Sequence, residues 1–282
     1  RVWLAAAGQV FFTLSVGFGI ILTYASYLSH KQDVALSGLT SVATNEFAEV
    51  VLGASIVIPA ACIFFGPAMI GPIAAEGAFN LGFVTMPLIF QQIPWGGLFA
   101  FMWFILLFLA GLTSSVSMLQ PAIAFMEDEF RMPRKYVILT IGLLTLAATQ
   151  PVIFFLGNGV LDELDFWAGT VGLVIFGTVE ALLFAWVFGI DRAWDEIHHG
   201  ADMRVPRIFK FIIKYVTPTF LFLILGTWLW QDRISVIMMQ DTPVANKPYV
   251  IATRFGLSAL FLLLCYLVHV AWKNRKVRGG RV

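Results

Sequence analysis

Apolar residues in this chain come in long blocks separated by short polar stretches, and apolar and polar positions do not alternate within a block. A helix needs about 20 residues to cross the hydrocarbon core of a bilayer, whereas membrane β-strands are short and alternate. The pattern therefore predicts an all-α membrane protein. We expect seven spans, at about 3–27, 46–65, 99–125, 136–156, 166–188, 209–230 and 249–272.

One semi-apolar stretch, residues 66–97, lies between the second and third predicted spans. It contains Gly71-Pro72, Pro87 and Pro94, and glycine and proline both interrupt regular helices. We therefore expect an extracellular re-entrant or surface helical hairpin rather than another span.

The composition also indicates a membrane protein, and it argues against a soluble domain, a disulfide framework and a nucleic-acid-binding protein. Hydrophobic residues make up 59% of the chain and charged residues 12%, with a mean hydropathy of +0.85. A soluble domain would carry roughly a quarter charged residues. Cys62 and Cys265 both lie inside apolar blocks, which argues against a disulfide framework. The basic residues are spread over loops and a tail, so nucleic acid is not expected as a partner.

The lysines and arginines are divided unequally between the two sides of the predicted bundle. The first, third and fifth loops and the tail 273–282 carry fourteen of them, and the opposite side carries four. The excess of basic residues predicts which side faces the cytoplasm. We expect a multi-pass protein of the cell inner membrane with a cytoplasmic C-terminus and with Arg1 outside. Since Arg1 is followed almost at once by a span, we also expect further helices to precede it.

The first predicted span contains two glycines and two hydroxyl residues near its middle, in the stretch FFTLSVGFG (11–19). Glycine costs about 1 kcal/mol in a helix interior. Unwound backbone at that depth is tolerated only where it lines a cavity, as in the broken helices of secondary transporters. The alternative is close helix packing by small residues.

Carboxylates appear at the start of the second predicted span. Glu46 is expected to reach the cytoplasmic interface, whereas Glu49 lies one turn deeper and is followed by apolar residues only. An ionisable group inside a span is a functional candidate because desolvating its charge is costly. The alternative is a carboxyl group held by hydrogen bonds between helices.

The third predicted span places Ala110, Thr113, Ser114 and Met118 on one helix face. Hydroxyl and carbonyl oxygens are hard, neutral ligands that suit a hard cation such as sodium. The alternative is that these hydroxyls bond to carbonyls of their own helix. The hydroxyls lack a companion histidine or lysine and the sequence has no HExxH pattern, so we do not expect an enzyme.

Four stretches together resemble the neurotransmitter:sodium symporter family, whose structural prototype is the bacterial leucine transporter. They are FFTLSVGFGIILTYASY (11–27), SGLTSVATNEFAEVVLGASI (37–56), AGLTSSVSMLQPAIAFMEDEF (110–130) and LDELDFWAG (161–169). The resemblance covers nearly the whole chain and corresponds to family helices six to twelve. It implies one membrane domain over 1–282, with the second inverted five-helix repeat in 1–188, two peripheral helices in 189–272 and a basic tail. The first repeat, helices one to five, is expected to be absent.

The resemblance also implies roles for individual residues. The substrate pocket would be lined by Phe12, Thr13, Ser15, Phe18, Ser114 and Met118, with Phe12 as its lid. Two sodium sites would use Thr13 and Asn45, and Ala110, Thr113 and Ser114, each completed by residues of the missing helices. Glu49 would replace the chloride ion of other members, so no chloride is expected. The outer gate would contain Asp165, and the inner gate network Asp128, Gln120, Ser26 and Tyr27.

The implied function is sodium-coupled symport of an amino acid or related small amine. The chain is expected to be the C-terminal portion of the transporter and not competent alone, with membrane lipid and the missing N-terminal helices, on the same or another chain, as partners. The alternative is a non-transporting truncated membrane module or the partner subunit of a split transporter.

Overall fold

The computed structural model describes residues 2–29, 32–69, 71 and 77–279. Lys31, residues 72–76 of the predicted hairpin and the last three residues of the predicted tail lie outside this part of the chain. Over the described residues the regular secondary structure is all helical and contains no strand. This confirms the predicted all-α class.

Six helices within the described residues are long and apolar enough to cross a membrane. They correspond to the second to seventh predicted spans, and they run over Val34–Phe65, Gly96–Phe130, Arg134–Phe154, Val160–Ile197, Ile208–Gln231 and Val244–Arg275. The chain is therefore a multi-pass membrane protein.

The first predicted span is interrupted near its middle. Helix α1 (Val2–Thr13) ends near the middle of the predicted span, and α2 (Ile20–Ala25) begins only at Ile20. The residues between them, Leu14–Gly19, leave helical geometry. The broken-helix alternative is therefore the one that the backbone adopts.

The predicted start of the second span is wrong. The helix begins at Val34 with α3 (Val34–Glu46), continues through a π-helical segment at Phe47–Gly53 and ends with α4 (Ala54–Phe65). Glu46 is therefore well inside a 32-residue helix, not at its entrance, and Glu49 lies near the middle of that helix. The stretch before Glu46 is rich in serine and threonine, which are common in loops, but in the structure it is helical.

The described residues divide into two compact units. One contains residues up to Ala35 together with Met118 and everything after it, and the other contains Leu36–Ser117.

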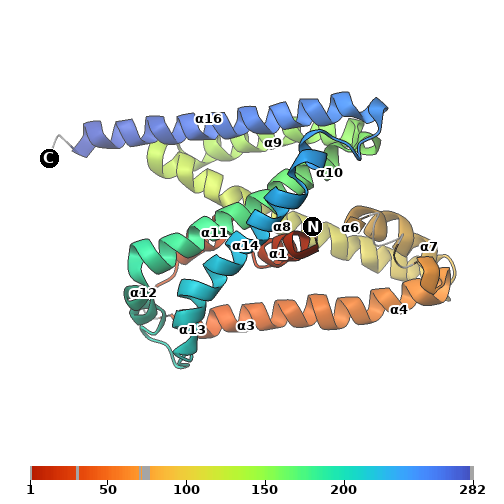
Figure 1. Cartoon of the computed structure of the whole chain (residues 1–282), viewed down its shortest axis with the longest axis horizontal. Coiled ribbons are helices and arrows are strands. Elements are labelled where there is room, and N and C mark those ends of the chain that lie inside the picture. Colours follow the sequence, from red (N-terminus) through yellow and green to blue (C-terminus); the bar gives the residue numbers. More distant parts are fainter. Residues whose placement is uncertain (1, 30–31, 70, 72–76, 280–282) are drawn as a thin grey trace. The chain divides into compact units, whose positions relative to one another are not determined.

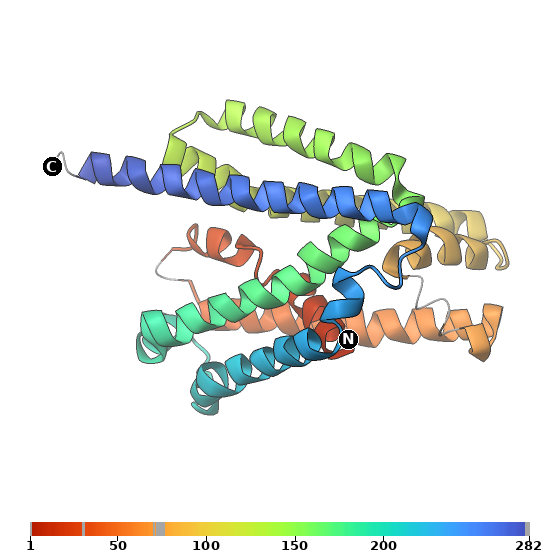
Figure 2. The same cartoon turned by 45° about the horizontal axis from the view of Figure 1, so that its top comes forward.

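In the first unit, α1 packs against the long helix Val160–Ile197 and against α14 (Thr217–Gln231) (Figures 1 and 2). The central part of that long helix is α11 (Leu173–Leu182), and Val174 on it is fully buried. The shared core consists of Leu4, Val171, Val174, Leu221, Ile224 and Trp228.

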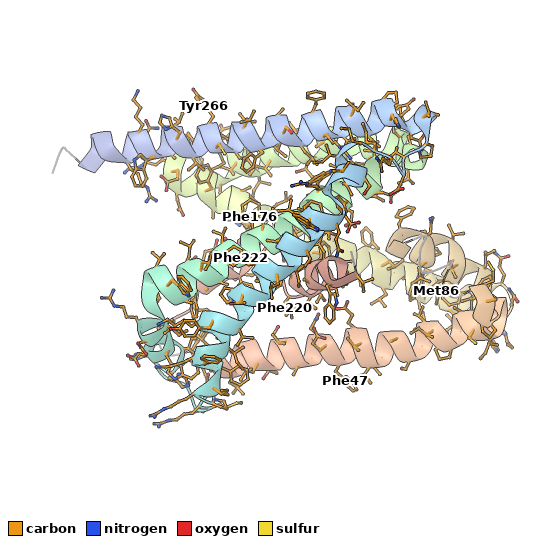
Figure 3. All side chains as sticks on the ribbon, in the orientation of Figure 1. Phe47, Met86, Phe176, Phe220, Phe222 and Tyr266 are labelled. Atoms are coloured by element: carbon orange, nitrogen blue, oxygen red, sulfur yellow. The ribbon has the colours of Figure 1, made fainter. Side chains whose placement is uncertain are left out.

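The same unit contains α9 (Arg134–Phe154) and α16 (Lys247–Gly279), whose axes are nearly parallel in both views while their chains run in opposite directions (Figures 1 and 2). The Phe155 and Tyr249 rings lie 4.9 Å apart, which joins the end of α9 to the start of α16. Phe176, Phe222 and Tyr266 project from the ribbon and are about half exposed or more (Figure 3). Such apolar surfaces are a liability in water but suit contact with lipid.

In the second unit, the stretch between the two long helices is helical from Gly77 to Phe90. It consists of α6 (Gly77–Asn80), a π-helical segment and α7 (Met86–Phe90). Met86, Ile89 and Phe90 form a small core with the end of α4 and the start of α8 (Gly96–Phe130). The Trp103 indole donates a hydrogen bond to the Gly82 carbonyl at 3.0 Å.

Candidate functional site

The break between α1 and α2 has backbone angles that an ordinary residue avoids. Gly17 and Gly19 have φ values of 82° and 74°, and Ser15 has a φ of 57°. Glycine takes this left-handed region at little cost, whereas a residue with a Cβ is disfavoured by roughly 1–2 kcal/mol. The two glycines of the sequence motif are therefore the residues that let the helix stop and restart.

One backbone group freed by the break is satisfied by a side chain far away in the sequence. The Gly17 N–H donates to Oε2 of Glu180, in α11, at 3.0 Å. A hydrogen bond with an ionised acceptor is about twice as strong as a neutral one. The sequence analysis missed Glu180. It is a carboxylate inside an apolar span, and the rule that selected Glu49 should have selected it too.

The break also lies unusually close to α11. A Cβ added to Gly17 would lie 3.0 Å from the Leu173 carbonyl oxygen, and one added to Gly177 would lie 2.6 Å from the Phe11 ring. Small residues therefore permit close helix packing here as well. The glycines therefore serve the interruption of the helix and its close contact with α11 together.

Two aromatic side chains meet at the break, Phe12 from the last turn of α1 and Phe18 from the break itself. The Phe12 and Phe18 rings are 5.6 Å apart at 73°, in an edge-to-face arrangement. Phe12 is 42% exposed, so its ring is not buried within its own unit. Thr13 and Ser15, which lie between these two residues in the sequence, are half-buried. Of the six residues predicted to contact substrate, the structure brings the rings of Phe12 and Phe18 together, and Thr13 and Ser15 lie between them in the sequence.

In α8 the Thr113 hydroxyl donates to carbonyls of its own helix, at 2.9 Å to Leu109 and 3.1 Å to Ala110. The Ser115 hydroxyl does the same to the Gly111 carbonyl at 2.6 Å. Back-bonding, the alternative from sequence, is therefore present. It uses the hydroxyl proton, and the oxygen lone pairs that would face a cation remain available. Ser114 and Met118, one turn apart, are exposed on the same helix.

The second unit also contains Asn45 and Glu49. Asn45 is half-buried near the end of α3, and Glu49 is half-buried in the π-helical segment Phe47–Gly53. π-Helical turns in proteins occur frequently at functional sites. The five predicted sodium ligands are thus divided: Thr13 lies in the first unit, and Asn45, Ala110, Thr113 and Ser114 in the second.

Asp165 opens another π-helical segment, Asp165–Gly172, inside the span Val160–Ile197. Its side chain is exposed and makes no ion pair with the described residues, and a Cβ on Gly169 would lie 2.8 Å from its Oδ1. The nearby Glu163, in contrast, holds parts of the fold together. It pairs with Arg254 and accepts from the Trp167 indole at 2.6 Å.

Arg254 ties α16 to the short helix α15 (Arg233–Ile237). Besides Glu163, its guanidinium donates to the Val236 and Ile237 carbonyls at 2.9 Å each. A guanidinium presents several donors in a fixed fork, so it can hold three partners at once. Sequence reasoning treated Arg254 only as a loop charge, since nothing in the pattern indicates its partners.

The predicted inner-gate residues are in separate local environments. The Ser26 hydroxyl donates to the Thr23 carbonyl at 2.6 Å, and Tyr27 is 61% exposed with its ring 6.5 Å from that of Tyr24. Asp128 is exposed, and its neighbours Glu127 and Glu129 pair with Arg134 and Arg275. The buried Oε1 of Gln120 has no hydrogen-bond partner among the described residues. These side chains do not form one network here.

Acidic, histidine and cysteine side chains do not gather into a metal-binding group of three or more anywhere in the described residues. The candidate ligands are hydroxyl, amide and carbonyl oxygens instead. Such a donor set suits an alkali or alkaline-earth cation rather than a transition metal.

The sequence matches a family model described as the Sodium:neurotransmitter symporter family over residues 1–274. It is 29% identical to an uncharacterized sodium-dependent transporter of Methanocaldococcus jannaschii, over 99% of this chain and 55% of that protein. It is 24% identical to the sodium-dependent dopamine transporter of Bos taurus, over 78% of this chain and 32% of that protein. It is 26% identical to the sodium- and chloride-dependent glycine transporter 2 of Xenopus laevis, over 82% of this chain and 30% of that protein. The chain thus spans about half the length of the first of these relatives and less of the other two.

Proposed function

The chain belongs to the sodium:neurotransmitter symporter family, and from this premise we propose that it forms part of a symporter that couples sodium entry to uptake of an amino acid or related small amine. Because it spans about half the length of the archaeal relative, the activity is proposed for a protein in which the counterpart of that relative's other half is also present. No catalytic step is involved.

The observation that carries the proposal is the unwound segment Leu14–Gly19. An interrupted helix with exposed peptide groups is the arrangement by which secondary transporters bind substrate and ions at mid-membrane. Phe12 lies just before this segment and Phe18 lies within it, and with Met118 they favour an apolar substrate side chain. In the proposed pocket, Thr13, Ser15 and Ser114 supply the polar contacts.

Sodium would be bound by Thr13 and Asn45 at one site, and by Ala110, Thr113 and Ser114 at the other. These oxygen ligands suit sodium. The Thr113 hydroxyl donates its proton to carbonyls of its own helix, so its oxygen lone pairs remain available to the ion. Ion binding would favour one of two transporter conformations by differential affinity. Asp165 at one gate, and Asp128, Gln120, Ser26 and Tyr27 at the other, would close alternately.

The test is uptake by the full-length protein that carries this sequence, reconstituted in vesicles with sodium or potassium outside. Thr113→Val removes one hydroxyl while keeping the side-chain shape. We expect it to raise the sodium concentration for half-maximal uptake by about tenfold, which corresponds to roughly 1.4 kcal/mol of binding free energy.

The matched control is Ser115→Ala, which also removes a back-bonded hydroxyl from α8 but lies off the face of Ala110, Thr113 and Ser114. Its sodium dependence should change less than twofold. Equal effects of the two variants would contradict the sodium role of Thr113. Uptake that runs equally well in potassium would contradict sodium coupling, and absence of uptake with either ion would favour the non-transporting module.

A further inference from the structure

A second pocket lies in the first unit, away from the helix break. Its volume is about 600 Å³, and it is formed where the π-helical segment Leu183–Gly189 and the start of α12 (Ile190–Ile197) meet the segment Ile212–Val216. Gly189, with a φ of 97°, redirects the chain there. Helices α12 and α13 (Ile208–Phe211) lie at the same end of the bundle in both views (Figures 1 and 2).

The charged side chains that line this pocket are Asp191, Arg192 and Lys214. The Asp191 carboxylate accepts a hydrogen bond from Nζ of Lys210 at 2.8 Å, so its charge is offset by a residue outside the lining. Arg192 and Lys214 then leave the pocket with two positive charges. Lys214 Nζ lies 5.4 Å from the centroid of the Tyr215 ring, a cation–π contact that keeps the ammonium group at this end of the helix.

The apolar part of the lining is exposed on the outside of the helix bundle. Trp186, Val187 and Phe188 are 59%, 76% and 51% exposed, and they lie directly before the kink. The Trp186 indole donates to the Lys214 carbonyl at 2.9 Å, which fixes the ring beside the basic residues. Tryptophan at the end of a span is typical of the boundary between acyl chains and headgroups.

Positive charge next to exposed apolar surface at a helix end matches one kind of molecule better than others. A soluble anion would use the two cations but leave the apolar surface in water, and a neutral lipid would use only the apolar surface. We propose that this pocket binds an anionic phospholipid, with the phosphate at Arg192 and Lys214 and an acyl chain along Trp186, Val187 and Phe188. The basic loops place this end in the cytoplasmic leaflet in our predicted orientation, where anionic lipids attract such residues.

The test is native mass spectrometry of the full-length protein titrated with dioleoyl-phosphatidylglycerol and, separately, with dioleoyl-phosphatidylethanolamine. The double variant Arg192→Gln/Lys214→Gln should raise the apparent Kd of the first phosphatidylglycerol bound by about tenfold to thirtyfold, since each basic residue near an anionic lipid contributes several-fold. Phosphatidylethanolamine binding should change less than threefold. Excess glycerol phosphate should not displace the lipid, because it lacks the acyl chain.

The matched control is Arg204→Gln/Arg207→Gln, which removes two arginines from the same basic loop but outside the lining. It should leave phosphatidylglycerol binding within threefold, and both variants should keep the thermal stability of the parent protein. Equal weakening by the two double variants would overturn the site in favour of a diffuse charge effect. Phosphatidylethanolamine binding as tight as phosphatidylglycerol, or displacement by glycerol phosphate, would overturn the lipid assignment.

Discussion

Glu180 shows how a single carboxylate can complete a broken helix. It accepts the Gly17 N–H in the middle of apolar surroundings, and this is a contact between residues 163 positions apart. A sequence pattern can indicate that such a carboxylate is unusual, but the partner is set by tertiary packing. The same holds for Glu163, whose partners Arg254 and Trp167 are known only from the structure.

Replacing Glu180 with Gln should loosen the break, because the Gly17 N–H loses an ionised acceptor. A hydrogen bond to a charged group contributes roughly 1.5–3 kcal/mol, so we expect amide hydrogen exchange in a peptide covering Leu14–Gly19 to rise at least about tenfold. Exchange measured by mass spectrometry on the full-length protein checks this.

Thr178→Val is the control for Glu180, since it changes a buried α11 residue whose hydroxyl only bonds the Val174 carbonyl of its own helix. Exchange at Leu14–Gly19 should stay within about twofold of the parent. A rise of similar size in both variants would mean that general loosening of α11, and not the lost acceptor, is responsible.

Glu49 lies near the middle of a 32-residue helix, so it is a stronger candidate for a functional carboxylate than an acid at the surface. If its fixed negative charge replaces an anion, Glu49→Ser should make sodium-driven uptake depend on external chloride, with a several-fold loss when chloride is replaced by gluconate. Glu46→Ser, three residues earlier on the helix, should show no such dependence. The same anion response before and after Glu49→Ser would contradict the role.

Individual site residues could be selected from sequence where their chemistry is out of place in lipid. Gly17, Gly19 and Glu49 meet that condition, since glycine in a helix interior and an ionisable group in lipid are both costly. Their mutual placement could not be selected in the same way. The predicted sodium ligands are divided between two compact units, and a linear pattern contains no information on how such units meet.

At the scale of elements, apolar run length predicted five of the spans closely. It failed at Val34, where α3 begins in a stretch rich in Ser, Thr and Gly that a hydropathy argument assigns to a loop. In a helix these hydroxyls can bond to carbonyls of the preceding turn, as Thr113 and Ser115 do in α8. Length and hydropathy therefore locate the apolar centre of a helix better than its polar end.

The contact between the break and α11 makes a prediction about packing. Gly177→Ala would place a Cβ 2.6 Å from the Phe11 ring, so it should cost about 1–3 kcal/mol and lower the apparent melting temperature by several degrees. Thermal unfolding of the full-length protein in detergent measures it.

Gly142→Ala is the matched control, because a Cβ there would meet nothing within 4 Å in α9. Alanine is the better helix former, so this variant should unfold at the same or a slightly higher temperature. The double variant Gly177→Ala/Phe11→Leu should recover part of the loss. If Gly177→Ala were as stable as Gly142→Ala, the close contact with Phe11 would be wrong.

At the scale of the whole molecule, family membership and helical class follow from the sequence, whereas orientation remains a prediction from charge. The loops grouped with the tail carry most of the lysines and arginines. A C-terminal tag on the full-length protein should therefore be cleaved by protease in inverted membrane vesicles but not in intact spheroplasts. Cleavage in intact spheroplasts would reverse the assignment of the basic side and the leaflet proposed for the lipid pocket.

The axes of α9 and α16 are nearly parallel, but the two helices differ greatly in length (Figure 1). At 1.5 Å per residue, the 21 residues of α9 extend for about 31 Å, close to the hydrocarbon thickness, and the 33 residues of α16 for about 50 Å. If α9 spans the hydrocarbon core of the bilayer, several turns of α16 extend beyond that core into water. The ion pair of Arg275 with Glu129 holds this part of α16 against the end of α8, so α16 would present a fixed helical surface outside the hydrocarbon core.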